Sequence, residues 1–353
     1  MSVKFIGFPL VCACAVLTAC SGGSAPTTPL AGPAAMPQSR HQSMAAAQSV
    51  QSVRADVRFG LNRATLEAAL VSRGAGVFPA AAKKQPILFV SDLDSQMIRL
   101  YPANVKNPSQ EGSITQGLNE PINAAVDKQG TLYVANNGNS TVTEYRLGET
   151  KPSITLSTSL VYPNGVAVDS KGTVYVTSGA SVGSCYVLEF PKGSTKPTVQ
   201  VNGFGLPIGL AVDKDDNLYV ADADSSQYAV WRVAKGSTSP TNLALSGLAD
   251  PTGVAIDESN NLYIANDLPP EDGGTTVLGF ELGKKKPFVT ITAGLNGPYS
   301  LGFESNGSLF VGNSLTYPGD VSGYKKGKVM PFEMLGNGIG NPAGIAVYPA
   351  PEF

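Results

Sequence analysis

The sequence predicts an all-β fold built from one repeated four-stranded unit, and three observations support this. The 39 glycines and 26 prolines are spread along the 353 residues, as expected for many turns between short strands. A common segment recurs at nearly constant spacing from residue 86 onward. Within each copy apolar and polar residues alternate, which is the period of a strand. A content of 42% hydrophobic and 15% charged residues also excludes global disorder.

The repeated segment consists of Pro-x-Gly, an alternating apolar stretch, an acid, a short turn and a second apolar stretch. One copy, from Pro163 to Ser178, reads PNGVAVDSKGTVYVTS. The copies start at Pro121, Pro163, Pro207, Pro251 and Pro298, and the first part of another starts at Pro342. Successive prolines are 42, 44, 44, 47 and 44 residues apart, which is the length of one propeller blade.

Each copy has the chemistry of a β-hairpin. Three residues after each acid stands a residue that tolerates the left-handed conformation of a tight turn: Gly130, Gly172, Asp216, Asn260 and Gly307. A third strand follows, such as residues 142–145, then a Gly-x-x-x-Pro turn and a fourth strand, such as 153–156. Four antiparallel strands make one blade.

The two ends of the repeat region complete each other. Residues 87–92 form the second strand of a unit that lacks its first, and residues 342–347 form a first strand that lacks its second. Their pairing closes the ring and leaves no orphan sheet edge. The sequence therefore predicts a six-bladed β-propeller over residues 86–353.

Residues 1–19 have a basic start and an apolar run too short to cross roughly 30 Å of hydrocarbon, which is typical of a signal peptide. Residues 17–20, Leu-Thr-Ala-Cys, followed by Ser21, resemble the bacterial lipoprotein signal. The resemblance implies cleavage before Cys20, lipidation of Cys20 and a place in the bacterial outer membrane or at the cell surface. The alternative is an ordinary signal peptide with Cys20 near the cleavage site.

Residues 20–85 are expected to be a tether, because their first part is rich in Ser, Ala, Pro and Gln without apolar periodicity. Residues 62–73 have the pattern of a short helix within it. Once the signal is removed, Cys185 is the one cysteine without a lipid, so no intramolecular disulfide is expected. Cys185 lies in a strand-like run and is expected to be a buried small apolar residue.

Composition excludes several functions. The formal net charge is −2, and the one long basic run is at residues 284–286, so phosphate-driven nucleic-acid binding is not expected. The chain has one histidine, His41, so mechanisms that need a His base beside a Ser or Cys nucleophile have no candidate. Nucleotide and haem motifs do not occur in the sequence, and no cofactor is predicted.

The repeats resemble those of the NHL family of six-bladed propellers, whose unit also reads Pro-x-Gly-Val-Ala-Val-Asp followed by Leu-Tyr-Val-Ala-Asp/Asn. The resemblance covers about residues 86–349 and implies the propeller fold. It does not imply one function, since members of the family include ligand- and protein-binding scaffolds and related propellers include metal-dependent lactonases. Function has to come from the site.

The repeated acids Asp127, Asp169, Asp213, Asp257 and Glu304 are interpreted as turn-stabilising carboxylates. More informative are the deviations at the residue after each proline, which should lie at one mouth of the channel: Ile122, Asn164, Ile208, Thr252, Tyr299 and Ala343. Glu120 and Asp250 precede prolines of the same mouth. The candidate ligand-binding residues are therefore Glu120, Asn164, Asp250, Thr252 and Tyr299.

Gluconolactonase-like propellers provide the enzymatic alternative. Glu120-Pro121 and Pro163-Asn164-Gly165 look like two parts of their metal site, which makes Glu120 and Asn164 a weak alternative metal pair. The third part of that site is an aspartate that binds the metal and acts as the base. Ile208 stands at its position here, so no catalytic residue is assigned. The sequence favours a lipid-anchored, non-enzymatic scaffold that binds a protein, peptide or glycan at the cell envelope, with a degenerate metal-dependent hydrolase as the alternative.

Overall fold

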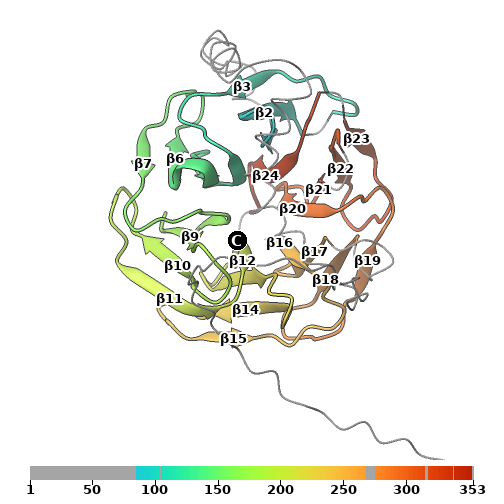
Figure 1. Cartoon of the computed structure of the whole chain (residues 1–353). Helices are drawn as coiled ribbons and strands as arrows, with labels where there is room; N and C mark the ends of the chain where they lie inside the picture. Colours follow the sequence, from blue (N-terminus) through green and yellow to red (C-terminus); the bar gives the residue numbers. More distant parts are fainter. Residues whose placement is uncertain (1–84, 104, 268–274, 315–316, 337, 352–353) are drawn as a thin grey trace, which may run out of the picture. The chain divides into compact units, whose positions relative to one another are not determined.

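The computed structural model describes residues 85–103, 105–267, 275–314, 317–336 and 338–351. These residues form six four-stranded antiparallel sheets arranged around a central axis (Figure 1). The predicted all-β six-bladed propeller is thereby confirmed. The expected signal peptide, Cys20 and the short helix at 62–73 lie outside the described residues.

Each blade runs from an inner strand at the axis to an outer strand at the rim. Blade 1 contains β24 (Pro342–Tyr348), β1 (Ile87–Asp92), β2 (Met97–Pro102) and β3 (Gly112–Ile114). Blade 2 contains β4 (Pro121–Val126), β5 (Leu132–Asn136), β6 (Thr141–Tyr145) and β7 (Ile154–Leu156). Blade 3 contains β8 (Val166–Val168), β9 (Val174–Ser178), β10 (Cys185–Phe190) and β11 (Val199–Phe204).

Blade 4 contains β12 (Pro207–Val212), β13 (Leu218–Asp222), β14 (Ala229–Val233) and β15 (Pro240–Asn242). Blade 5 contains β16 (Pro251–Ile256), β17 (Leu262–Asn266), β18 (Thr276–Phe280) and β19 (Val289–Ile291). Blade 6 contains β20 (Pro298–Phe303), β21 (Leu309–Asn313), β22 (Asp320–Tyr324) and β23 (Glu333–Leu335). A single 3₁₀ turn, η2 (Asn137–Asn139), interrupts the strands of the described chain. In the residues that the structure covers, no helix has the length and apolar character of a membrane span.

Blade 1 is assembled from both ends of the repeat region. Strand β24 pairs with β1 in antiparallel register, from Ile87 opposite Tyr348 to Ser91 opposite Gly344. This is the pairing that the two incomplete units predict. In Figure 1 the red β24 accordingly lies in the same blade as the blue-green β2, and β1 is the strand between them. Both edges of β1 are therefore paired.

The hydrophobic core lies between blades rather than within them. Six of the buried apolar clusters each combine residues of two neighbouring blades. Between blades 2 and 3, for example, Tyr133 and Val142 pack with Val176 and Phe190. A blade can bury its faces only against its neighbours, so the propeller depends on the complete ring.

The repeated acids stabilise the turns that join first and second strands. In blade 4, Asp213 Oδ1 accepts hydrogen bonds from the N–H groups of Asp215 at 2.9 Å and Asn217 at 2.8 Å. The Tyr219 hydroxyl donates to Asp213 Oδ2 at 3.1 Å. Asp127, Asp169 and Asp257 accept the same pair of turn amides. The predicted role in the turns is thereby confirmed for these four aspartates.

The glycine of Pro-x-Gly is required by close approach of adjacent inner strands. A Cβ on Gly209 would lie 2.4 Å from the backbone oxygen of Thr252 in the next blade. The corresponding distances to backbone oxygens are 2.3 Å at Gly165, 2.5 Å at Gly344 and 2.8 Å at Gly253. No Cβ fits at such distances, so these glycines allow the inner strands to close around a narrow axis.

Cys185 is the first residue of β10 and is buried, as predicted. Only 7% of the surface of Cys185 is exposed, and its thiol donates a hydrogen bond to the backbone oxygen of Ser181 at 3.2 Å. Burial, together with the charge of Asp222, raises the pKa of this thiol to about 11. The thiol is therefore protonated at neutral pH and is not a nucleophile.

Candidate functional site

A cavity of about 750 Å³ opens at the end of the channel where the inner strands begin. Pockets of this size are within the range that holds small ligands or peptide side chains. Its lining includes Ile122, Asn164, Ile208, Tyr299 and Ala343, which are five of the six residues that follow the repeat prolines. The prediction that these positions converge at one mouth is therefore correct for five of them.

The floor of the cavity is apolar. Ile122, Ile208, Tyr299 and Ala343 form one buried cluster with Ala223. Leu93 and Leu206 pack against this cluster and also line the cavity. The floor therefore offers a ligand desolvated hydrocarbon surface, and the polar groups of the lining are confined to a few positions.

Glu120 is held at the rim by its backbone. Its φ of +49° is left-handed, which is uncommon for a residue other than glycine. Its N–H donates to Gln96 Oε1 at 2.7 Å, and its carbonyl accepts from the N–H of Asn137 at 3.1 Å. The side chain lies across Gly138, where a Cβ would be 3.0 Å from both Cγ and Cδ of Glu120. These contacts fix the position of Glu120 in the lining of the cavity.

Tyr162 and Asn164 extend the rim from blade 3. Tyr162 also has a left-handed φ, +44°, its N–H donates to Ser140 Oγ at 3.1 Å, and the residue is 51% exposed. Asn164 Oδ1 accepts from Asn137 Nδ2 at 3.3 Å. Asn164 therefore brings a side-chain amide, which can both donate and accept hydrogen bonds, to the lining of the cavity.

Asp250 and Thr252 do not reach the cavity. Both are 0% exposed, and neither belongs to the lining. The Thr252 hydroxyl donates to the backbone oxygen of Pro298 at 3.2 Å, so it is used within the fold. Asp250 lies near the phenol of Tyr299, whose pKa is raised by burial first and then by the charges of Asp267 and Asp250. Of the five candidates, the structure thus brings together Glu120, Asn164 and Tyr299.

Sequence reasoning missed the left-handed residue before the proline. Glu120, Tyr162, Asp250 and Gly297 all stand directly before a repeat proline and all have positive φ. Of these four positions, only Gly297 could have indicated a left-handed backbone from the sequence, because glycine is the residue that favours this conformation. The loop at residues 179–182, which also lines the cavity, was missed because it contains no motif.

The described residues do not fit a divalent metal. Glu120 is the one carboxylate among the lining residues of the mouth. At the position where the gluconolactonase-like pattern needs an acid stands Ile208, which is 2% exposed. Over the described chain, no three His, Cys, Asp or Glu side chains form a group that could hold a metal. A hard cation is held best by several carboxylates, and the described lining of this cavity supplies one.

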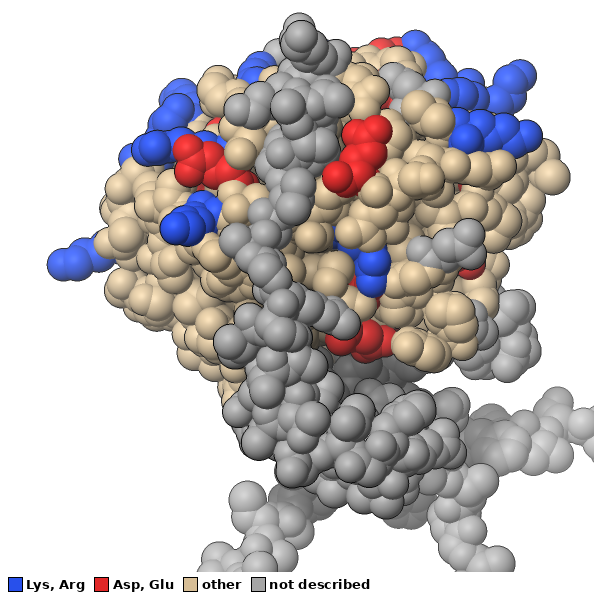
Figure 2. Space-filling view, turned by 90° about the horizontal axis from the view of Figure 1, so that it is seen from above, with Lys and Arg blue, Asp and Glu red and all other residues tan. Residues whose placement is uncertain are grey.

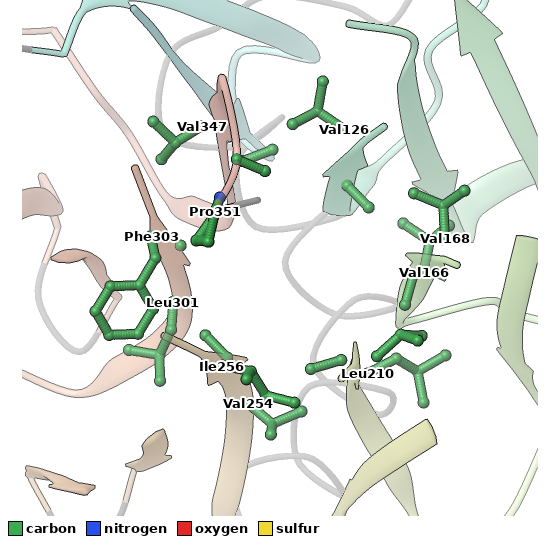
Figure 3. A pocket seen from close by; sticks show the side chains of 18 of the residues that line it. Val126, Val166, Val168, Leu210, Val254, Ile256, Leu301, Phe303, Val347 and Pro351 are labelled. Atoms are coloured by element: carbon green, nitrogen blue, oxygen red, sulfur yellow. The ribbon is translucent and has the colours of Figure 1, made fainter. Parts of the chain in front are cut away.

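The cavity toward the other end of the channel is smaller. It has a volume of about 200 Å³ and is lined by residues of the inner strands, including Val126, Val168 and Phe303, and of the turns that follow them. Figure 3 shows side chains from several inner strands around one central space, with Pro351 beside it. This end also carries charged groups at its rim, among them Asp127, Lys128 and Lys214, and sequence reasoning did not single it out.

One buried carboxylate lies away from both channel ends. Glu333 in β23 is 4% exposed, and neither of its carboxylate oxygens has a hydrogen-bond partner among the described residues. Burial raises its pKa to about 7, with a further contribution from Glu304 that the charge of Lys325 opposes. This group therefore titrates near neutral pH.

Comparisons with solved structures define the class as six-bladed β-propellers. A chain of a nidogen/laminin complex is similar, with a TM-score of 0.61 and 16% identity over 76% of this chain and 100% of that chain. A protein of unknown function from Bacteroides caccae is similar, with a TM-score of 0.57 and 11% identity over 75% of this chain and 99% of that chain. At these identities the likeness concerns the fold alone. No protein-family model matches the sequence, and no curated protein matches it significantly.

Proposed function

We propose that this protein is a non-enzymatic binding scaffold whose ligand site is the cavity at the channel mouth. The observation that carries the proposal is the cavity itself, about 750 Å³ in volume, with an apolar floor and isolated polar groups at its rim. Such a composition is typical of binding pockets. Hydrolysis would need a base and an electrophilic partner at the same place, and the described lining offers one carboxylate.

We infer that the ligand belongs to a protein, peptide or glycan of the cell envelope. The fold is compatible with this, because one structural neighbour comes from a nidogen/laminin complex. The repeat residues also support assignment to the NHL type, whose members include binding scaffolds. Propellers present several loops at one face, which suits recognition.

We further propose that Cys20 carries lipid and holds the propeller at the bacterial outer membrane or cell surface. The support is the Leu-Thr-Ala-Cys sequence directly after an apolar segment. More than one acyl chain on Cys20 would give stable anchoring. If residues 20–85 are a flexible tether, they would span roughly 40–45 Å and let the mouth reach ligands away from the bilayer.

The test compares two variants that borrow residues from blade 6. Asn164→Tyr introduces the residue that blade 6 has at the same repeat position, and it narrows the mouth. Val168→Phe makes the matched change at the end of β8, toward the other channel end, where blade 6 has Phe303. The purified chains are applied to peptide and glycan arrays. We expect ligands retained by the wild type and Val168→Phe and lost by Asn164→Tyr; equal binding by all three chains would contradict the proposal.

A further inference from the structure

The charges of the propeller are distributed unequally between its two faces. At the mouth face lie the loops that join second to third strands and fourth to first strands. The described residues of these loops include no Lys, Arg or His. They include five carboxylates: Asp94, Glu120, Asp224, Asp250 and Asp267. These loops therefore contribute negative charge to the mouth face, and Arg99 of β2 reaches one of them through a hydrogen bond to Ser95 Oγ at 3.0 Å.

The basic residues are concentrated in the turns of the opposite face. These turns contain Lys128, Lys171, Lys192, Lys214, Lys235, Lys284 and Lys326, among others. In Figure 2 most of the Lys and Arg side chains gather toward the upper part of the molecule. A formal net charge of only −2 for the whole chain hides this separation.

Within the cavity, Glu120 is the ionisable group for which the described structure provides no counterion. No ion pair or side-chain hydrogen bond of its carboxylate occurs among the described residues, whereas its backbone is held on both sides. A carboxylate fixed at the edge of an apolar floor favours a cationic partner, because the attraction is stronger where water is partly excluded.

We propose that the mouth cavity binds a peptide segment that presents a Lys or Arg side chain flanked by apolar residues. The proposal rests on the proposed function of the cavity and specifies its ligand. The cationic group would meet Glu120, and its aliphatic stem would lie on Ile122 and Ile208, as long basic side chains pack on hydrocarbon. The half-exposed ring of Tyr162 at the rim adds an aromatic face for the cation. The Asn164 amide can donate to a peptide carbonyl.

The test measures fluorescence anisotropy of the purified full chain with three labelled peptides. The probes are acetylated, amidated Gly-Leu-X-Leu-Gly peptides in which X is arginine, neutral citrulline of nearly the same shape, or glutamate. We expect the arginine peptide to bind at least tenfold more tightly than the citrulline peptide and the glutamate peptide to bind most weakly. The preference should shrink as ionic strength rises.

Glu120→Gln should remove the arginine preference, because it deletes the charge and keeps the shape. Glu149→Gln makes the same chemical change on an exposed turn of the opposite face and should alter binding less than twofold. An arginine peptide that does not bind, equal affinity for arginine and citrulline, or a preference that survives Glu120→Gln would each overturn the proposal. The array experiment then separates two outcomes. If the arrays give ligands that Asn164→Tyr no longer binds, the cavity binds a ligand of another charge and the proposed function stands. If the arrays give no such ligands, the proposed function fails as well.

Discussion

Replacing Gly209 by alanine tests whether the inner strands really approach each other as closely as the structure indicates. The new Cβ would lie 2.4 Å from the backbone oxygen of Thr252 and 3.0 Å from the backbone nitrogen of Val254. Ordinary contact begins about 1 Å further away than the first of these distances. Both neighbours are backbone atoms, so no side-chain rotation relieves the clash. The strands of blades 4 and 5 must move apart.

The expected loss of folding stability follows from two opposing effects. Overpacking of a core costs about 1–3 kcal/mol, and rigid backbone neighbours place this site near the upper end. Alanine also reduces the entropy of the unfolded chain, which returns roughly 0.5–1 kcal/mol because φ at Gly209 is not left-handed. The free energy of unfolding should therefore fall by about 2 kcal/mol, which lowers the melting temperature by about 4–8 °C in a domain of this size.

The assay is thermal unfolding followed by the fluorescence of Trp231, the single tryptophan of the chain, which lies in the same blade. The control is Gly336→Ala, where the nearest atom to the new Cβ is Asp320 Cβ at 3.7 Å. This variant should melt within about 2 °C of the wild type. A Gly209→Ala protein that melts with the control would refute the close-approach argument.

Three further predictions concern other parts of the chain. Because the pKa of Glu333 is raised to about 7, its protonated form is favoured by folding, so the stability it contributes is present at low pH and lost as pH rises through 7. Glu333→Gln should flatten this dependence and gain up to about 3 kcal/mol at pH 8, visible in melting temperature against pH; an unchanged profile would contradict the assignment. Cys20→Ser should move the protein from the membrane to the soluble fraction, and retention in the membrane would exclude the lipid anchor. Deleting residues 342–353 removes β24 from blade 1 and should abolish cooperative melting, whereas an unchanged transition would show that the ring does not need this closure.

Much of the architecture could be predicted because the fold is encoded locally and repeatedly. Five of the blades contain a hairpin with its own turn acid and left-handed turn residue, so each is specified within a short stretch of chain, whereas blade 1 is made from both ends of the repeat region. The third strand predicted at residues 142–145 is β6 at Thr141–Tyr145, and the fourth predicted at 153–156 is β7 at Ile154–Leu156. Repetition made each assignment a test of the others.

The candidate site was predictable only in part. The position after each proline was expected at the mouth, and Asn164 and Tyr299 lie there. Thr252 has the same sequence position and is nevertheless fully buried, because its hydroxyl is bonded to the backbone at Pro298. Glu120 and Asp250 have equivalent positions and similar left-handed backbones, yet one lines the cavity and the other is enclosed. Neighbouring blades, which the local sequence does not describe, decide between these outcomes.

The sequence by itself determined the class of fold, the number of repeats that form blades, and which residues of each hairpin form its strands and its turn. These features depend mainly on residues close to one another in the chain. Tertiary structure alone decided the shape of the cavity, the pairing of Glu120 with the loop at Asn137 and Gly138, and the separation of charge between the two faces. These features depend on which loops meet at one end of the ring. That arrangement exists only when six blades have closed around a common axis.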